Sequence, residues 1–485
     1  MRTSLGELRG DIEGGIGVWR GVPYAEQPVG PRRFLAPAAQ KPWTGVREAL
    51  EHGPLPPQTT SFVGGGRDDP KTRDEACLTV TVWSPDTTAS LPVMVWIPGG
   101  AFVYGAGQFQ LYNGSRLAAN GNVVVVNVTY RIGVFGGLEL GDLGPGFDDN
   151  LALRDQLAAL RWVREHIAAF GGDPDRVTVF GESAGATSVL ALLACPQASG
   201  LFHRAIAQSP ALPLIADREL RAARARDFLS HLGVPAADVK DLPQRLLRRA
   251  AGQVQLASAA QTPTLAYGLT HGTELLPRHP IDAARAGELA RVPLIIGTNS
   301  HEATMFAWTR PPMLPTTQAT VHAYFDRVAP TAKSSVLQAY PRYPRRSALI
   351  AIGSDVMFGG PAWAFADAYS CRAPTRMYRF DHAGLSLRLL GLGATHGSEI
   401  VHVQHSYASF IGRKLHPLGR RFPPSVGVRM QRTWLDFACS DRVHDEANWP
   451  LYDVEHRRTR LIATRRDAVE DDPDRTRRRA WAAIY

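Results

Sequence analysis

The segment Gly181-Glu182-Ser183-Ala184-Gly185 matches the pattern G-x-S-x-G, in which a serine side chain can act as a nucleophile at a sharp turn. The pattern alone is weak evidence, but a β-branched stretch (176–180) runs directly into it and an apolar helical pattern (181–194) follows. Small residues two positions on either side avoid clashes at the turn, and the N-terminal N–H groups of the helix face the developing negative charge. The alternative interpretation is a small-residue turn that packs a helix against a sheet.

A serine nucleophile also needs a base, and the base needs a carboxylate that orients it. With turns of this kind, the chain order is serine, acid, histidine. Among 15 histidines, His396 lies between glycines in GLGATHGSEI, which indicates an irregular loop of the kind that carries functional residues. Glu302, in LIIGTNSHEATMF, follows a predicted strand, where catalytic loops gather in open α/β sheets. From these residues alone, an ordinary loop role stays open for both.

The third requirement is an oxyanion hole, a set of backbone N–H groups aimed at the oxygen of the tetrahedral intermediate. WIPGGAF (96–102) follows a strand pattern and offers consecutive small residues whose N–H groups can turn inward. One such donor stabilises the transition state by about 3 kcal/mol. Taken alone, the segment is better explained as a glycine turn at the end of a strand.

Alternating strand and helix patterns surround these segments and must position them. They predict, in chain order, strands at 91–97 and 122–130, an amphipathic helix over 148–170 that GGDPD (171–175) ends, a strand at 176–180, a helix over 181–194, and strands at 292–298 and 376–381. This order predicts a doubly wound α/β sheet. The chain has no internal repeat and no long linker, so we expect a single domain over residues 1–485.

The Pro/Gly-rich stretch 53–70 is predicted to be a long surface loop, of the kind that often forms a lid or a binding loop. The walls of the substrate pocket are expected between Ala211 and Tyr267 and between Phe306 and Gly359.

Composition excludes several classes of protein. With 44% hydrophobic and 20% charged residues over 485 positions, the chain is neither disordered, nor collagen-like, nor a disulfide scaffold. The apolar runs are too short for a membrane span and no signal peptide is apparent, so we expect a cytoplasmic protein without a membrane partner. The net charge is +9, but the densest basic stretch, 457–479, is interleaved with acidic residues. That stretch predicts a solvated helix face or tail rather than a nucleic-acid site.

The cysteines and histidines do not form a metal pattern. Four cysteines, at 77, 195, 371 and 439, are widely spaced and contain no CxxC pair, so free buried thiols are expected rather than a zinc site or a redox pair. His402 and His405 lack a matching carboxylate or cysteine pattern. No metal and no cofactor are expected.

Beyond these motifs, ordered blocks over nearly the whole chain resemble the type-B carboxylesterase/lipase family, which includes the cholinesterases. The blocks are RGVPYAEQPVGPRRFLAP (20–37), KPWTGVREA (41–49), DEACLTVTVWSP (74–85), WIPGGAFVYG (96–105), NVTYRIGVFG (127–136), 155–186, SGLFHRAIAQS (199–209), VPLIIGTNSHEATMF (292–306), THGSEI (395–400) and WPLYD (449–453). So many blocks in family order make the resemblance highly specific.

The resemblance implies an α/β-hydrolase fold, with a large, mostly parallel central sheet, helices on both faces and inserted helical cap regions. It also implies a role for each matching residue: Ser183 as nucleophile, His396 as general base and then acid, Glu302 as orienting carboxylate, the N–H groups of Gly100, Ala101 and Ala184 as oxyanion donors, and Glu182 and Ser209 as buried residues near the histidine.

The chain departs from the family pattern in three places. The oxyanion loop reads Pro-Gly-Gly-Ala where His-Gly-Gly-Gly is commonest, and Pro98 stands at a position that does not donate. Cys77 matches a cysteine that forms a disulfide in secreted relatives, but no cysteine precedes it here. The stretch 53–70 has Phe62 as its one aromatic residue and lacks the tryptophan that binds quaternary ammonium groups, which argues against choline esters.

These observations predict a serine carboxylesterase that hydrolyses esters of short to medium acyl chains through an acyl-enzyme on Ser183. The expected partner is a small-molecule ester, and the expected state is a monomer or a weak homo-oligomer. Two alternatives stay open: an amidase or carbamate hydrolase with the same machinery, and a catalytically inactive relative that serves in binding. An interfacial lipase is disfavoured because the 53–70 stretch is polar and glycine-rich.

Overall fold

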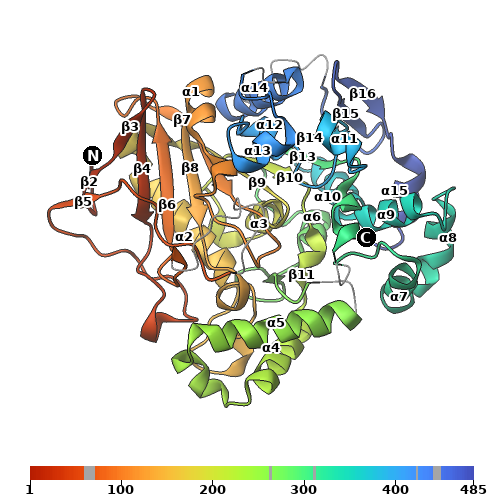
Figure 1. Cartoon of the computed structure of the whole chain (residues 1–485), viewed down its shortest axis with the longest axis horizontal. Helices are drawn as coiled ribbons and strands as arrows, with labels where there is room; N and C mark the ends of the chain where they lie inside the picture. The colour runs from red at the N-terminus through yellow and green to blue at the C-terminus, as the bar shows by residue number, and fades with distance from the viewer. Residues whose placement is uncertain (59–71, 262–264, 310–312, 422–423, 441–448) are drawn as a thin grey trace.

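The computed structural model describes residues 1–58, 72–261, 265–309, 313–421, 424–440 and 449–485. An 11-stranded sheet crosses the molecule, with helices on both faces (Figure 1). From edge to edge its strands are β16 (Ala468–Asp471), β15 (Arg458–Ile462), β14 (Thr375–Phe380), β13 (Leu294–Asn299), β10 (Arg204–Gln208), β9 (Gly172–Glu182), β7 (Leu91–Ile97), β8 (Val124–Thr129), β6 (Thr79–Ser84), β4 (Ile16–Pro23) and β3 (Asp11–Glu13). Neighbours from β8 to β15 are parallel, and the outer pairings are antiparallel. The predicted α/β class is confirmed.

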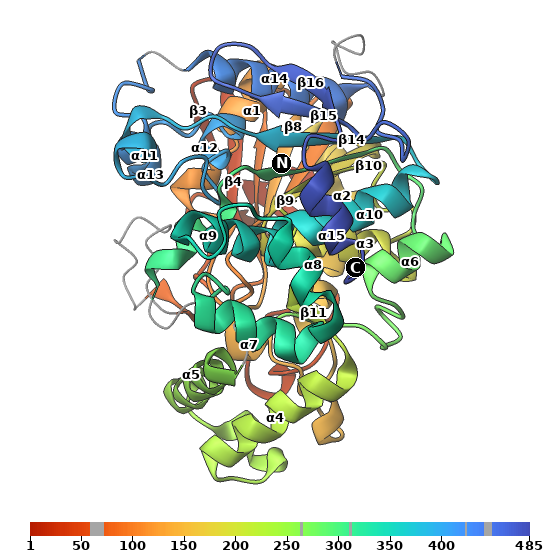
Figure 2. The ribbon, with the colours of Figure 1, turned by 90° about the vertical axis from the view of Figure 1, so that its right-hand side faces the viewer.

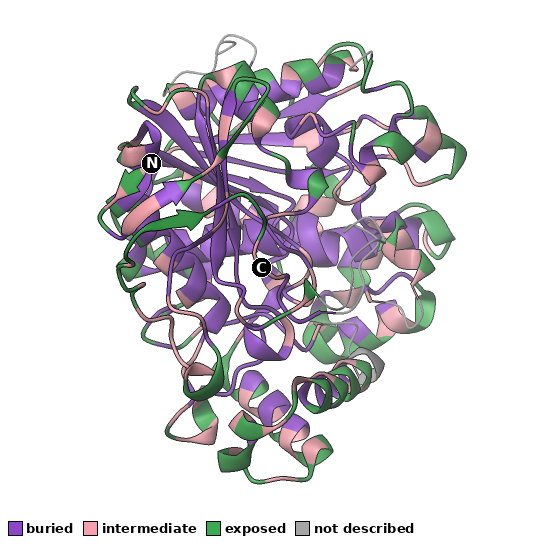
Figure 3. Cartoon of the chain, turned by 60° about the vertical axis from the view of Figure 1, so that its left-hand side comes forward, coloured by how far each residue is buried: buried purple, intermediate pink, exposed green. Residues whose placement is uncertain are grey.

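The central strands are apolar on both faces because two hydrophobic cores enclose them. In β7, Val93, Val95 and Ile97 enter one core, while Met94 and Trp96 enter the other. A parallel strand buried on both faces reads as a continuous apolar run, which is why the sequence predicted it. Figure 3 shows the central strands of the sheet as buried, while the edge strands β3 and β16 are largely exposed.

Helices cover each face of the sheet (Figure 2). One core includes residues of α2 (Leu151–His166), α3 (Ala184–Leu193), α6 (Pro280–Ala286) and α10 (Gly360–Ser370). The other includes residues of α1 (Ser115–Gly121), α12 (Ile400–Val403), α13 (Phe410–Leu415) and α14 (Ser425–Cys439). The remaining helices are α4 (Arg218–Leu232), α5 (Gln244–Gln261), α7 (Gln318–Val328), α8 (Lys333–Gln338), α9 (Arg346–Ser354), α11 (Leu385–Leu389) and α15 (Arg475–Trp481).

Two groups of these helices are insertions between sheet strands. α4 and α5 lie between β10 and β13 in the chain and form the lower end of the molecule in Figure 1. The second insertion, α7 to α10, lies between β13 and β14.

The chain also forms two small sheets. One consists of β1 (Arg2–Thr3), β2 (Gly6–Arg9) and β5 (Val46–Glu48), and the other pairs β11 (Ile215–Ala216) with β12 (Leu269–Thr270).

The predicted helix over 148–170 is observed as α2 and a 3-10 turn that ends at Phe170. Gly171 stops it, because its φ of +78° is left-handed and a Cβ there would lie 1.9 Å from the carbonyl oxygen of Asp86. The next strand then starts at Gly172 rather than at 176, so the GGDPD stretch belongs partly to β9.

A buried ion pair joins the end of β8 to α2. The Arg131 guanidinium donates to Asp155 through Nε at 2.8 Å and Nη2 at 2.6 Å, and the Arg131 backbone N–H donates to the same carboxylate at 3.1 Å. Both side chains are at most 2% exposed. The loop that follows β8 is therefore held to the helix by a pair that water does not screen.

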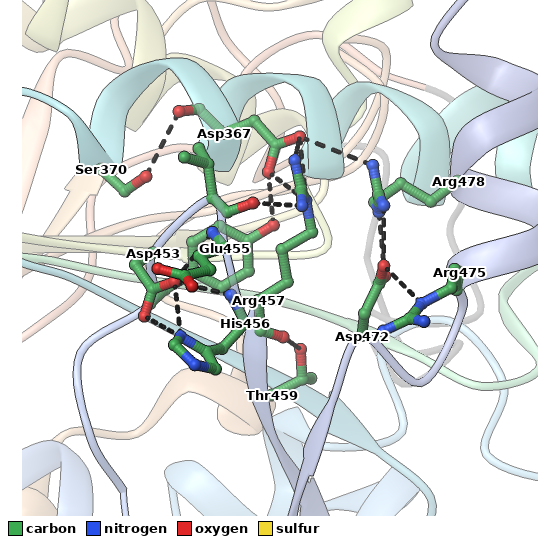
Figure 4. Close-up of polar contacts among 12 residues, drawn as sticks. Asp367, Ser370, Asp453, Glu455, His456, Arg457, Thr459, Asp472, Arg475 and Arg478 are labelled. Carbon is green, nitrogen blue, oxygen red and sulfur yellow. Dashed lines mark hydrogen bonds and ion pairs between the residues drawn. The ribbon is translucent and has the colours of Figure 1, made fainter.

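The arginine-rich C-terminal stretch bears out its prediction only in part. It forms β15, β16 and α15, and Arg475 and Arg479 of the helix are exposed, as expected for a solvated face, but other arginines of the stretch pair with carboxylates (Figure 4). Arg457 contacts Asp367 of α10 at 3.0 Å, and Arg478 contacts Asp472 at 2.7 Å. Trp481 of α15 is 1% exposed and packs the helix against the core. The charge pattern along the stretch did not indicate this contact.

The 53–70 stretch is described only up to residue 58, and Phe62 lies outside the described residues. Residues 55–58 are buried, contrary to the surface-loop prediction. The Gln58 side chain causes this, since it donates to the backbone oxygen of Gly105 at 3.2 Å and accepts from its N–H at 2.9 Å.

The four cysteines are free thiols, as predicted, with Cys77 and Cys195 buried. Cys371 is exposed, which the sequence did not predict, because it lies at the end of α10. In the part of the chain that the structure describes, one stretch, Arg346–Ser370, is long and apolar enough to cross a membrane, and 83% of its apolar window is buried inside the protein.

Candidate active site

Ser183 lies at the turn between β9 and α3, near the middle of the sheet. Its φ of +58° and ψ of −123° are strained for a residue with a side chain. A Cβ on Gly185 would meet the carbonyl oxygen of Ile97 at 2.0 Å, and one on Gly181 would meet the same oxygen at 2.7 Å. The glycines of the G-x-S-x-G pattern are therefore required by close packing against β7, as expected from the sequence.

His396 and Glu302 form a buried pair. Nδ1 of His396 lies 2.7 Å from Oε2 of Glu302, and the backbone N–H of Asn299 donates to the other carboxylate oxygen at 2.7 Å. Glu302 follows β13 in a 3-10 turn, which is where the sequence placed a catalytic loop. The hydrogen bond from the Asn299 N–H orients the Glu302 carboxylate, and the carboxylate in turn orients the His396 ring through Nδ1.

The other ring nitrogen of His396 faces Glu182. Nε2 lies 3.1 Å from Oε1 of Glu182, the residue directly before Ser183. Among the described residues, no hydrogen bond joins the Ser183 hydroxyl to His396. Hydrogen bonds in active sites without substrate are often long or poorly aligned and tighten in the substrate complex.

The predicted oxyanion donors surround the serine turn. Gly100 and Ala101 have φ values of +114° and +57°, which turn the backbone after β7 away from an extended path. Ala184 is the first residue of α3, so its N–H has no partner within the helix. Within the described segments, no hydrogen bond uses the N–H of any of these three residues. All three N–H groups are thus available to an incoming oxygen.

Gly99 shows how closely this loop approaches the serine turn. A Cβ at Gly99 would lie 2.4 Å from the carbonyl oxygen of Glu182 and 3.1 Å from the Cβ of Ser183. The loop after β7 and the serine turn therefore touch through backbone atoms, which places the candidate donors beside the candidate nucleophile.

Glu182 and Glu302 both contact the His396 ring, and burial and charge perturb the pKa values of Glu182 and His396. Burial is the largest effect on Glu182 and raises its pKa to about 8. Burial alone would lower the pKa of His396, but the charges of Glu182 and Glu302 outweigh it and raise that pKa to about 9. Perturbed groups of this kind gather at functional sites.

Glu399 is a buried site residue that the sequence analysis missed. It accepts from the Asn299 amide at 2.5 Å and from the Gln208 amide at 3.4 Å, and burial raises its pKa to about 7. Its position three residues after His396, before an apolar helix turn, was the one available signal.

Ser209 lies at the end of β10, with a φ of +49° and no solvent exposure. Its N–H donates to the carbonyl oxygen of Gly297 at 2.8 Å. Its hydroxyl has no hydrogen-bond partner among the described residues, so the structure does not connect it to His396.

A mainly apolar cavity of about 350 Å³ opens beside the oxyanion loop. It is lined by residues of that loop and of the two regions where pocket walls were expected, including Val103, Arg248, Leu256, Tyr267, Thr309 and Met313. Phe306, three residues before Thr309, packs its ring 5.4 Å from that of His396. Ser183, Glu302 and His396 are not among the residues that line the cavity, so its link to the candidate site is through the oxyanion loop at Val103.

The chain is similar to known proteins over nearly its whole length. A model described as "Carboxylesterase family" matches residues 1–481. The chain is 37% identical to para-nitrobenzyl esterase of Bacillus subtilis (strain 168), over 99% of this chain and 97% of that protein. It is 32% identical to phenmedipham hydrolase of Pseudarthrobacter oxydans, over 93% of this chain and 92% of that protein.

Solved structures give the same result. A PNB esterase structure superposes with a TM-score of 0.90 at 36% identity, covering 100% of this chain and 99% of the other. A Geobacillus stearothermophilus carboxylesterase superposes with a TM-score of 0.85 at 34% identity, covering 99% of both chains.

Proposed function

Because this chain belongs to the carboxylesterase family, that of the type-B carboxylesterases and lipases, and is a carboxylic-ester hydrolase, we propose that Ser183, His396 and Glu302 are its catalytic triad. The contact of 2.7 Å between His396 Nδ1 and Glu302 Oε2 carries this proposal. A carboxylate at Nδ1 holds the ring in the tautomer whose Nε2 can accept a proton.

In the proposed reaction, Ser183 Oγ attacks the ester carbonyl and its proton passes to His396 Nε2. The imidazolium that forms is stabilised by the charge of Glu302. The N–H groups of Gly100, Ala101 and Ala184 donate to the oxyanion of the tetrahedral intermediate. The C–O bond to the alcohol breaks, Nε2 returns the proton to the alcohol oxygen, and Ser183 remains acylated.

The second half of the reaction repeats these roles with water as the nucleophile. His396 takes a proton from the water, which attacks the acyl carbon. The intermediate collapses with breakage of the bond to Ser183 Oγ, and Nε2 returns a proton to the serine. No step uses a metal or a cofactor.

We assign Glu182 a role in setting the charge of this site. Burial raises its pKa to about 8, and its charge is the largest of those that raise the pKa of His396, ahead of that of Glu302. The Glu182 carboxylate thus stabilises the imidazolium from the Nε2 side, as Glu302 does from the Nδ1 side.

The substrate class we propose is small-molecule esters with short to medium acyl chains. The cavity of about 350 Å³ beside Val103 is mainly apolar and suits groups of that size. We further propose that the enzyme acts in the cytoplasm as a monomer or weak homo-oligomer, without nucleic acid or membrane. The arginine-rich C-terminal stretch pairs with carboxylates of the protein itself, which argues against a nucleic-acid partner.

The test is hydrolysis of p-nitrophenyl acetate, butyrate and a long-chain ester by the wild type, Ser183→Ala and Ser199→Ala. Ser199 is exposed and serves as the matched control. We expect turnover of the short esters by the wild type and Ser199→Ala, and a loss of at least about 10⁴-fold in Ser183→Ala. Comparable turnover by Ser183→Ala would refute the assignment of the nucleophile.

An organophosphate that labels reactive serines, followed by peptide mapping, separates the alternatives. Wild type that is labelled at Ser183 but turns over no ester is an amide or carbamate hydrolase, to be assayed on those substrates. Wild type that is neither labelled nor active has no working triad.

A further inference from the structure

Three buried histidines from separate segments meet on the face of the sheet covered by α12 to α14. His382 follows the end of β14, His402 belongs to α12, and His416 directly follows α13. They are 5%, 1% and 9% exposed, and one ring nitrogen of each lies within 4.8 Å of the other two. We call these three residues the histidine cluster.

The rings are spaced as they would be around a single ion. The ring centres of His382 and His402 lie 5.1 Å apart, those of His402 and His416 4.7 Å, and those of His382 and His416 6.0 Å. A tetrahedral ion with nitrogen ligands at about 2.0 Å holds imidazole centres roughly 5 Å apart and the ligand nitrogens about 3.3 Å apart. Shifts of about 1 Å in the rings bring the nitrogens from 4.8 Å to that spacing.

Two rings are already held from their outer side. Nδ1 of His382 lies 2.9 Å from the Thr464 hydroxyl, and Nδ1 of His402 lies 2.9 Å from the Tyr407 hydroxyl. Metal-binding histidines commonly donate their second ring N–H to such an oxygen, which orients the ring and leaves the other nitrogen with a free lone pair.

The remaining nitrogen of His382 is the observation that points to a ligand. Nε2 of this buried ring has no hydrogen-bond partner among the described residues. A buried polar atom without a partner is costly, and a bound ion is one of the ordinary explanations for such an atom.

We propose that His382, His402 and His416 bind one divalent transition-metal ion, with Zn²⁺ as the best-suited ion. Sets of three histidines hold zinc in proteins without a carboxylate ligand. No residue of the proposed triad belongs to the cluster, so the ion takes no part in the proposed ester hydrolysis. It joins the ends of β14 and α13 to α12, the helix that directly follows Glu399 and the His396 loop.

From the sequence, no metal was expected, and His402 was considered together with His405. The structure pairs His402 with two histidines that lie at least 14 positions away and leaves His405 outside the cluster. Ligands so far apart in the sequence give no short spacing motif, so the pattern could not have been found without the fold.

The full chain is first freed of metal with a chelator, and the chelator is removed by dialysis. The metal-free protein is then titrated with Zn²⁺ by calorimetry and with Co²⁺ by visible absorption. The variants are His382→Gln, His416→Gln and Thr464→Val, with His405→Asn as the matched control. Asparagine suits position 405 because φ there is +48°. Circular dichroism checks that each variant is folded.

We expect the wild type and His405→Asn to bind one equivalent, with tetrahedral Co²⁺ bands and a higher Tm when Zn²⁺ is present. His382→Gln and His416→Gln should bind at least tenfold more weakly, and Thr464→Val about 10–100-fold more weakly. Initial rates of ester hydrolysis at 25 °C should not depend on Zn²⁺. Binding of well under one equivalent by the wild type, or equal affinity in His382→Gln, His416→Gln and the wild type, would overturn the proposal. If either glutamine variant does not fold, Thr464→Val decides by the same comparison.

Discussion

Replacing Glu302 by Gln removes the charge next to His396 and keeps the size of the side chain. At a distance of 2.7 Å and an effective dielectric constant of about 20, the attraction between that carboxylate and the imidazolium is about 6 kcal/mol. This corresponds to roughly four powers of ten in rate if the imidazolium is fully formed in the transition state. Glu182 remains 3.1 Å from the other ring nitrogen and compensates in part. We therefore expect kcat to fall by about 10³ to 10⁴.

The same variant should change the pH dependence in a defined direction. His396 must be neutral to accept the serine proton, so kcat/KM falls as pH drops below the pKa of His396. Glu302 is one of the charges that raise this pKa to about 9. Its removal lowers the pKa, and the acidic limb of the profile should move to lower pH.

The assay is p-nitrophenyl butyrate hydrolysis from pH 5 to 10, with active sites counted by organophosphate titration. Glu288→Gln, at an exposed position, is the control for the loss of one negative charge. A loss of less than tenfold in Glu302→Gln, with the acidic limb unmoved, would refute the assignment of Glu302 as the orienting carboxylate.

Three further predictions concern stability and access. Gly185→Ala should lower the free energy of unfolding by about 1–3 kcal/mol and abolish most activity, because the new methyl group lies 2.0 Å from the carbonyl oxygen of Ile97. The control is Gly252→Ala, which has open space around its Cβ and should leave the Tm unchanged or raise it. Asp155→Ala should cost about 3–5 kcal/mol in urea unfolding because it leaves a buried arginine unpaired, while Asp175→Ala, in an exposed ion pair, should change little; equal effects would contradict the role of burial. A thiol reagent should modify Cys371 rapidly in the native protein and all four cysteines after denaturation, and folding should not depend on reductant; fewer than four thiols in the denatured chain would reveal a disulfide.

The sequence predicted the parts of the fold whose pattern depends on local burial. Strand β7 was predicted at its observed bounds because both of its faces are apolar, and α3 was predicted because it follows the serine turn directly. The start of β9 was missed because Gly172 to Asp175 carry turn residues and still continue the strand. The burial of residues 55–58 was missed because it depends on Gln58 and Gly105, which are distant in sequence.

For the candidate site, the resemblance supplied what spacing could not. His396 and Glu302 are 94 residues apart, and their local context made them candidates but left an ordinary loop role open for both. Glu399 and the histidine cluster were missed for the same reason, since each depends on segments that only the fold brings together. The contact of His396 Nε2 with Glu182 is also a tertiary feature that no pattern encodes.

The pairing of the C-terminal stretch with α10 and the residues before it has a consequence for synthesis on the ribosome. Asp355 is buried and accepts from Arg477 at 3.0 Å, and Asp367 pairs with Arg457 (Figure 4). A nascent chain that already contains all three proposed catalytic residues lacks these two cations until Arg457 and Arg477 have been added. Loss of the tail by proteolysis or a premature stop codon would leave both carboxylates without them. Ester hydrolysis by truncated chains should thus report on whether residues 457–477 are present, since these residues supply the partners of Asp355 and Asp367.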